Sequence, residues 1–183
     1  MNLLNSILIL VAAYLAVFCE AVFGGLRHWV GAQLDLLPAL MVYASLSSNL
    51  LTVALLAGAG GMLYDSLSAN PLGVSVLPLL LIGFVIHQRR ELILRDQAFA
   101  QFSLGLGACA FAPLATLLLV LTTGQQPLVG WGSLWQWGVT SLAGAIATPL
   151  IFQVFARFNQ LFGYRRAAEA PFRPDRQIRR GRS

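Results

Sequence analysis

The chain alternates long apolar stretches with short polar or basic connections, and these stretches are the first guide to its fold. A helix needs about 20 largely apolar residues to cross the hydrocarbon core of a membrane. Charged residues, glycine, proline or tryptophan bound the clearest candidates. We predict membrane-spanning helices over Leu3–Phe23, Leu72–Ile86, Ala98–Thr122 and Leu134–Phe158.

A further apolar stretch, Leu34–Tyr64, is too long for one span. As a single helix it would extend for about 46 Å at about 1.5 Å per residue, whereas the hydrocarbon core is about 30 Å thick. Ser47, Ser48 and Asn49 lie within it, and short polar side chains compete for backbone hydrogen bonds and favour turns. We therefore predict two short helices, tilted or partly buried in protein, and six spans in total.

Composition agrees with a membrane protein. The 183 residues are 57% hydrophobic and 10% charged, with a mean hydropathy of +0.73, whereas soluble domains are about 45–50% apolar and about 25% charged. The two cysteines, Cys19 and Cys109, lie in apolar runs, which argues against a disulfide framework or a metal site. The predicted fold class is an all-α integral membrane protein, with one six-span bundle over residues 1–164.

The basic residues predict how this bundle is oriented. All twelve are arginines, and eleven fall in the connection His87–Asp96, at Arg157 or in the carboxy-terminal segment; only Arg27 falls on the opposite side. The positive-inside rule then places both termini in the cytoplasm. A five-span arrangement, with Arg27 inside and the amino terminus outside, stays open.

Residues 165–183 are predicted to form a basic, disordered cytoplasmic tail, because prolines interrupt them. Such a tail fixes topology and rests on anionic lipid headgroups, or it is a docking arm for a cytoplasmic partner. We expect no nucleic-acid binding, since no aromatic residues are interleaved with the charges. Its arginines are Arg165, Arg166, Arg173, Arg176, Arg179, Arg180 and Arg182.

The most informative segment is Gly58–Gly73, in which Gly58, Gly61 and Asp65 stand at i, i+3 and i+7 and are expected on one helix face. Small residues on that face would let a neighbouring helix approach closely, and a carboxylate within a membrane is a functional candidate. The alternative is that Asp65 ends the helix and accepts local hydrogen bonds, with Asn70–Gly73 as the turn into the next span.

This segment resembles the central motif of the rod shape-determining protein MreD family. The resemblance lies in Gly61-Met62-Leu63-Tyr64-Asp65, in Pro71-Leu72-Gly73, and in the helix that ends at His87-Gln88-Arg89-Arg90. Asp35-Leu36-Leu37-Pro38 also resembles, with its order changed, a region that opens the second helix of that family. The chain departs from the family in its long tail after Arg166.

The resemblance implies a six-helix fold similar to that of the substrate-binding subunits of energy-coupling-factor vitamin transporters. It implies a subunit of the bacterial cell-elongation machinery in the inner membrane, which binds the scaffold protein MreC and, through it, the MreB filament and the peptidoglycan synthases. It brings no catalytic residues and no cofactor. We expect partner contacts at Gly58, Gly61, Asp65, Pro71 and Gly73.

The sequence leaves one other functional class open and disfavours a second. In a small-molecule transporter subunit, Glu20, Asp35 and Asp65, all near the predicted outer ends of spans, would form a shallow acidic mouth. An intramembrane enzyme is disfavoured, because His28 and His87 are far apart and lie outside the spans.

The last two predicted spans are rich in small residues and each contains a proline, at Pro113 and Pro149, which predicts kinks. We expect these two helices to face the Gly58 side of the bundle, closing it or leaving a groove for a partner helix. Trp131, Trp135 and Trp137, just before the last span, are typical of an aromatic belt at the outer interface.

Overall fold

The structure, a computed structural model, describes residues 3–22, 35–68, 71–91, 93, 97–123 and 130–167, and side chains between residues 5 and 160 of these ranges. All regular elements in these ranges are helices. They are α1 (Leu3–Val22), α3 (Leu37–Ser47), α4 (Leu50–Leu55), the π-helical turn η1 (Leu56–Gly60), α5 (Gly61–Leu67), α6 (Val76–Arg89), α7 (Ala98–Thr122) and α8 (Trp131–Ala167). Because α4, η1 and α5 follow one another without a break, they act as one helix, and the described residues form six helical segments.

Four of these segments are long and apolar enough to cross a membrane: Asn5–Val22, Leu50–Leu67, Ala98–Thr122 and Trp131–Gln160. Their outward faces carry many exposed large apolar side chains, among them Leu15 and Phe18 on α1 and Leu118 on α7. Exposed apolar surface of this extent needs an apolar surrounding. The chain is therefore described as a multi-pass membrane protein.

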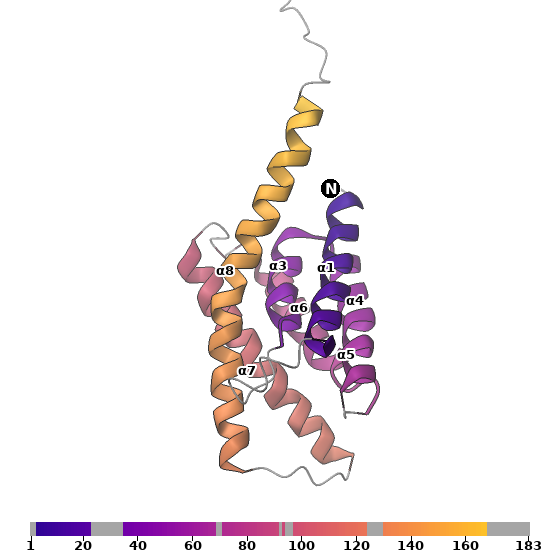
Figure 1. Cartoon of the computed structure of the whole chain (residues 1–183), viewed down its shortest axis with the longest axis vertical. Helices are drawn as coiled ribbons and strands as arrows, with labels where there is room; N and C mark the ends of the chain where they lie inside the picture. Colours follow the sequence, from indigo (N-terminus) through magenta and orange to yellow (C-terminus); the bar gives the residue numbers. More distant parts are fainter. Residues whose placement is uncertain are drawn as a thin grey trace, which may run out of the picture.

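The short helix α3 lies at the centre of the bundle. Residues Leu37 to Leu46 are all buried, and α3 contacts α1, α6, α7 and α8 (Figure 1). Its 11 residues span only about 16 Å, so the surrounding helices, and not lipid, cover it. Ser48 and Asn49 have extended backbones and separate α3 from α4. The prediction of two helices joined at this point, one of them buried in protein, is confirmed.

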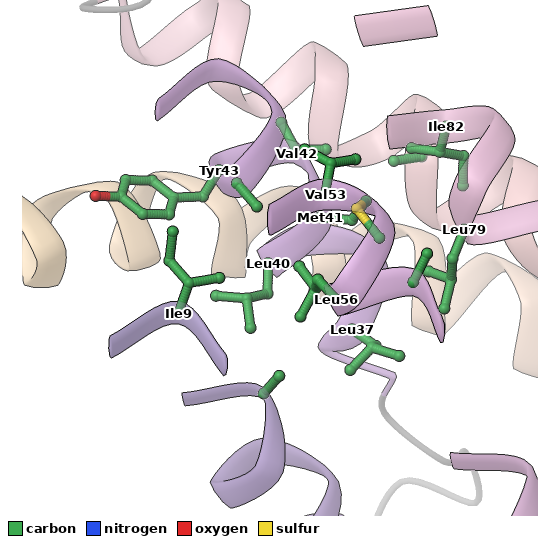
Figure 2. Packing of buried hydrophobic residues seen from close by; sticks show 14 of the residues in the cluster. Ile9, Leu37, Leu40, Met41, Val42, Tyr43, Val53, Leu56, Leu79 and Ile82 are labelled. Atoms are coloured by element: carbon green, nitrogen blue, oxygen red, sulfur yellow. The ribbon is translucent and has the colours of Figure 1, made fainter. Parts of the chain in front are cut away.

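Buried apolar side chains from most of the helices meet around α3 (Figure 2). Ile9 of α1 and Leu56 of η1 are fully buried against it. On the side of α8, the Tyr43 ring stacks on Phe155 with centroids 4.3 Å apart and meets Phe152 edge-on at 4.9 Å. Aromatic pairs in these arrangements add to the stabilisation from burial alone.

Helices α7 and α8 form a tight pair through glycine. A Cβ at Gly105 would lie 2.1 Å from Thr148 Oγ1, and one at Gly144 would lie 2.1 Å from Cys109 Sγ, so only glycine permits this approach. The pair contacts α3, whereas α4, η1 and α5 pack on α1, α3 and α6 (Figure 1). The α7–α8 pair makes its main contacts with α3, and α7 also with α6, so the expected packing of these two helices against Gly58 in η1 is not seen.

The observed helix ends differ from the predicted spans chiefly in α6 and α8. Helix α6 starts at Val76 and not at Leu72, because residues 72–75 form a turn. Helix α8 starts at Trp131 and continues to Ala167. The tryptophans predicted to precede the last span thus belong to its first two turns, where Trp131 and Trp135 are exposed.

The two ends of the bundle differ in charge among the described residues. At the acidic end, α1 and α5 finish near Glu20 and Asp65 and α3 begins after Asp35. At the basic end, α6 finishes with His87 and Arg89, and the ring Nδ1 of His87 lies 3.0 Å from the carbonyl oxygen of Ser45, in the last turn of α3. The start of α1 and the end of α8 lie toward the same end of the bundle (Figure 1), as an even number of passes requires.

Candidate functional site

Asp65 is the best-connected side chain of the acidic end. It is 1% exposed. Its Oδ2 accepts hydrogen bonds from the backbone N–H groups of Gly73 at 2.9 Å and Ser75 at 3.0 Å, and Ser75 Oγ donates to its Oδ1. Ser75 precedes the first residue of α6. Of the two interpretations of Asp65 offered by the sequence, local hydrogen bonding to the next turn is the one the structure displays, although the carboxylate is buried and not at the surface.

Glu20 and Asp35 play a matching part at the start of α3. Glu20 Oε1 accepts the N–H of Leu36 at 2.7 Å, and Asp35 Oδ1 accepts the N–H of Leu37 at 2.9 Å. The first N–H groups of a helix have no partner within it, and the helix dipole favours negative charge there. The three acidic residues therefore each stabilise the start of one of the two short helices.

The carboxyl of Asp35 titrates above its usual range. Burial raises its pKa from the ordinary 3.8 to about 6; the negative charge of Asp65 also raises it, and the hydrogen bond from the Leu37 N–H partly offsets these effects. Asp35 and Asp65 are 30 positions apart in the chain, and the charge of Asp65 reaches Asp35 because both residues lie at the acidic end.

The two glycines of the predicted partner face have different surroundings. A Cβ at Gly61 would lie 2.9 Å from Val76 Cγ2 and 3.0 Å from the backbone of Val76, whereas a Cβ at Gly58 would meet nothing within 4 Å. Gly58 lies within the π turn η1, where the angle between successive residues differs from that of an α-helix, and Gly61 directly follows this turn. Gly61 and Asp65 both meet the start of α6, as expected for residues on one face, whereas the position of Gly58 is open, so Gly58 alone departs from the expected arrangement.

The turn between α5 and α6 contains the other two motif residues. Gly73 has φ +90°, a conformation that residues with a Cβ rarely adopt. Its carbonyl oxygen accepts the N–H of Val76, and the carbonyl of Pro71 accepts the N–H of Val74, both at 3.3 Å. Pro71 and Gly73 thus shape the turn that Asp65 holds.

Two neighbouring cavities open beside this acidic end. One has a volume of about 320 Å³ and lies between α3, α5, α7 and the first turns of α8; the other has about 250 Å³ and reaches α6. Both are lined by Asp35, Tyr64, Pro113 and Leu117. Of the acidic residues predicted to form a mouth, Asp35 lines a cavity, whereas Asp65 is enclosed by its hydrogen bonds.

Sequence reasoning missed Ser75, and it predicted Trp137 only as part of an interfacial belt and not its contact with α7. Ser75 directly follows the motif and bonds to Asp65 through both its backbone and its hydroxyl. Trp137 Nε1 donates to the carbonyl oxygen of Ala110 at 2.9 Å, in the turn before Pro113, where a proline weakens the helical hydrogen bonds. The position of Ser75 next to a motif turn was a usable signal, whereas nothing local marks the pairing of Trp137.

The basic tail falls almost wholly outside the described residues. The backbone of α8 includes Arg165 and Arg166, but side chains beyond residue 160 are not described. Arg173, Arg176, Arg179 and Arg180 lie outside the described residues, as does Arg27 on the opposite side. The proposed role of the tail at lipid or at a partner therefore stays a prediction.

No known family model, curated protein or solved structure matches this chain. The resemblance to the MreD family therefore rests on the motif residues themselves. Among the described residues, no group of three histidine, cysteine or acidic side chains is placed to hold a metal ion.

Proposed function

We propose that this protein is a non-enzymatic subunit of the bacterial cell-elongation complex, of the MreD type. It spans the inner membrane six times, binds MreC, and through MreC connects to the MreB filament and the peptidoglycan synthases. In this proposal the two short helices α3 and α6 count as passes. Protein covers α3 on all sides, whereas α6 is buried on one face and exposes apolar side chains such as Leu77 and Phe84 on the other. The protein acts by positioning its partner.

One observation carries the proposal: the residues of the family-like motif depend on one another. Asp65 accepts hydrogen bonds from Gly73 and Ser75, and Gly61 packs on Val76. Residues up to 15 positions apart thus build one unit between α5 and α6. Such mutual dependence is expected of a motif that defines a fold, and it supports the resemblance drawn from these residues.

Affinity purification from a mild detergent, followed by mass spectrometry, tests the proposal. A tagged chain should bring down MreC and peptidoglycan synthases at levels well above those of an unrelated six-span protein with the same tag. Absence of MreC from the eluate, with the bait intact and monodisperse, would contradict the assignment to this complex.

Gly58 offers a direct test of the partner surface. A small, open position on a membrane helix lets a second helix approach closely, and a Cβ at Gly58 meets nothing in the chain itself. Gly58→Leu should lower MreC recovery at least tenfold while leaving thermal stability unchanged. Gly107→Leu is the matched control, because Gly107 of α7 is exposed and equally open. Equal MreC recovery with both variants would remove Gly58 from the interface.

A small-molecule transporter subunit is the second candidate, and the cavity of about 320 Å³ beside Asp35 favours it. Cavities of about 300–1,000 Å³ with a few polar groups are typical of ligand sites. In the same purification, recovery of ATPase and coupling subunits without MreC would select this function.

A further inference from the structure

The larger cavity has a chemical character that neither scaffold function nor helix capping requires. One carboxylate, Asp35, lines a space whose walls are mostly apolar or aromatic, with Pro113, Leu117 and Leu134 among the apolar residues. Two aromatic side chains, Tyr64 and Trp137, line the same space. A cavity of about 320 Å³ lies within the range of small-molecule sites.

The fold explains why the space exists. Helices α7 and α8 are locked together by the contacts of Gly105 with Thr148 and of Gly144 with Cys109. Beyond that level, toward the acidic end, the two helices diverge (Figure 1). Pro113 stands on α7 one turn past Cys109 and lines the cavity. The proline prevents α7 from continuing the close approach, because its ring disrupts the regular helical turn.

The hydrogen bonds hold the polar walls in place and leave capacity for a ligand. Trp137 is tied through Nε1 to the carbonyl of Ala110, so its ring is fixed at the cavity. Asp35 uses Oδ1 for the N–H of Leu37. A carboxylate has two oxygens and about four acceptor positions, so Asp35 retains acceptor capacity after that bond. Gln136 and Thr140 add polar atoms from the adjacent turns of α8.

From this geometry we propose that the cavity binds an organic ammonium group attached to an apolar body. The carboxylate of Asp35 provides the charge partner, and the rings of Trp137 and Tyr64 attract a cation through their faces. The apolar wall accommodates the rest of the molecule. The inference holds whether or not the protein binds MreC, because it uses no residue of the Gly58 surface.

Two sources could supply this chemistry: a free amine, or the amine of a phosphatidylethanolamine headgroup. The probe pair is 2-phenylethylamine, which is an ammonium ion at neutral pH, and 2-phenylethanol, a neutral molecule of similar size. Calorimetric titration of the full chain in nanodiscs of phosphatidylglycerol alone measures both affinities, after subtraction of titrations into empty nanodiscs. We expect the ammonium to bind at least tenfold more tightly than the alcohol.

Substitutions separate the site from a general surface effect. Asp35→Asn keeps an oxygen to accept the Leu37 N–H but removes the charge, and it should weaken binding of the ammonium at least tenfold. Glu20→Gln is the matched control, because it likewise keeps an acceptor for Leu36 and is not among the cavity walls. It should change the affinity less than threefold.

Repeating the titration in nanodiscs that contain equal parts phosphatidylethanolamine identifies the source. Competition that weakens the probe indicates a lipid headgroup in the cavity, and an unchanged affinity indicates a free amine. The proposal fails if the wild type binds no ammonium, or if the alcohol binds equally well. It also fails if Asp35→Asn binds like the wild type. The comparison of the two probes uses only the wild-type chain, so it remains decisive if a variant does not fold.

Discussion

At the residue scale, Asp65 shows how a buried charge can organise a turn. Its carboxylate satisfies two backbone N–H groups and one hydroxyl, and without it these donors stay buried and unpaired. Each unsatisfied buried donor costs about 1–3 kcal/mol. Asp65→Ala is therefore expected to lower the free energy of unfolding by at least about 3 kcal/mol, measured as a lower midpoint of thermal unfolding in detergent.

The neighbouring Ser66 provides the control for that measurement. Its hydroxyl is exposed and donates only to the carbonyl of Leu63 in its own helix. Ser66→Ala should leave the midpoint within about 1 °C, since exposed substitutions change stability by about 0.5 kcal/mol or less. A similar midpoint for Asp65→Ala and Ser66→Ala would show that Asp65 does not hold the turn.

The two motif glycines are expected to respond oppositely to alanine. At Gly61 a methyl group would press on the backbone of Val76, 3.0 Å away, and overpacking of this kind costs about 1–3 kcal/mol. At Gly58 the methyl group meets open space, and alanine favours a helix over glycine by about 1 kcal/mol. Thermal unfolding should give a lower midpoint for Gly61→Ala and an equal or higher one for Gly58→Ala. A fall for both would contradict the open position of Gly58.

The raised pKa of Asp35 predicts that the stability of the folded chain falls as the pH rises, which is the opposite of the effect of an ion-paired acid. Its pKa is raised from 3.8 to about 6 chiefly by burial, so the folded chain holds this proton more tightly than the unfolded chain does. The stabilisation is fully present below about pH 4 and is lost as the pH rises through about 6. Between pH 4.5 and 7.5, the midpoint of thermal unfolding should therefore decrease more for the wild type than for Asp35→Asn.

Glu20 on α1 and Asp65 on α5 lie at the same acidic end and are present in both proteins, so the difference between the two proteins reports the charge of Asp35 together with its effect on Glu20. If the two proteins lost the same number of degrees over this pH range, the carboxyl of Asp35 would have to titrate near its ordinary value.

At the scale of elements, the α7–α8 pair depends on a reciprocal fit. Gly144→Ala would place its Cβ against Cys109 Sγ and Cβ, and it should lower the thermal midpoint by an amount that corresponds to about 1–3 kcal/mol. Adding Cys109→Gly removes the obstructing atoms, so the double variant should recover part of the loss beyond additivity. Gly138→Ala on the same helix, which meets nothing within 4 Å, should be neutral. If the changes in thermal midpoint of the two single variants simply add in the double variant, Gly144 and Cys109 are not in contact.

The sequence predicts those elements whose causes are local. The bounds of α7 at Ala98 and Thr122 follow from its apolar run, and the break at Ser48 and Asn49 follows from polar side chains that compete with the helix. The position of Asp35 and Asp65 at the same end of the bundle also follows from the order of the spans, because neighbouring antiparallel helices bring their ends together.

Other features depend on distant contacts and have no local signal. The π turn η1 rotates Gly61 toward Val76, although the residues there read as ordinary helix. The partner of Trp137 is set by how α7 and α8 cross. The cavity at Asp35 arises from the divergence of these helices, and periodicity within either helix does not reveal it.

At the scale of the whole molecule, the charges at the ends of the bundle predict its orientation. His87, Arg89 and Arg90 lie at the basic end, and Glu20, Asp35 and Asp65 lie at the acidic end. Because arginines accumulate on the cytoplasmic side, we expect the basic end inside the cell. Labelling of single cysteines with a membrane-impermeant maleimide tests this, in a chain that carries Cys19→Ser and Cys109→Ala.

Trp131→Cys reports the acidic end, because Trp131 is 87% exposed in the first turn of α8, and Glu91→Cys reports the basic end. In intact cells with a permeable outer envelope, the first should be labelled at once and the second only after the inner membrane is opened. Asn2→Cys distinguishes six spans from five: it should behave like Glu91→Cys, because an even number of passes leaves the amino terminus and the end of α8 on one side. Labelling of Asn2→Cys from outside, with Glu91→Cys still protected, would mean that one of the helices from α1 to α6 does not cross the membrane.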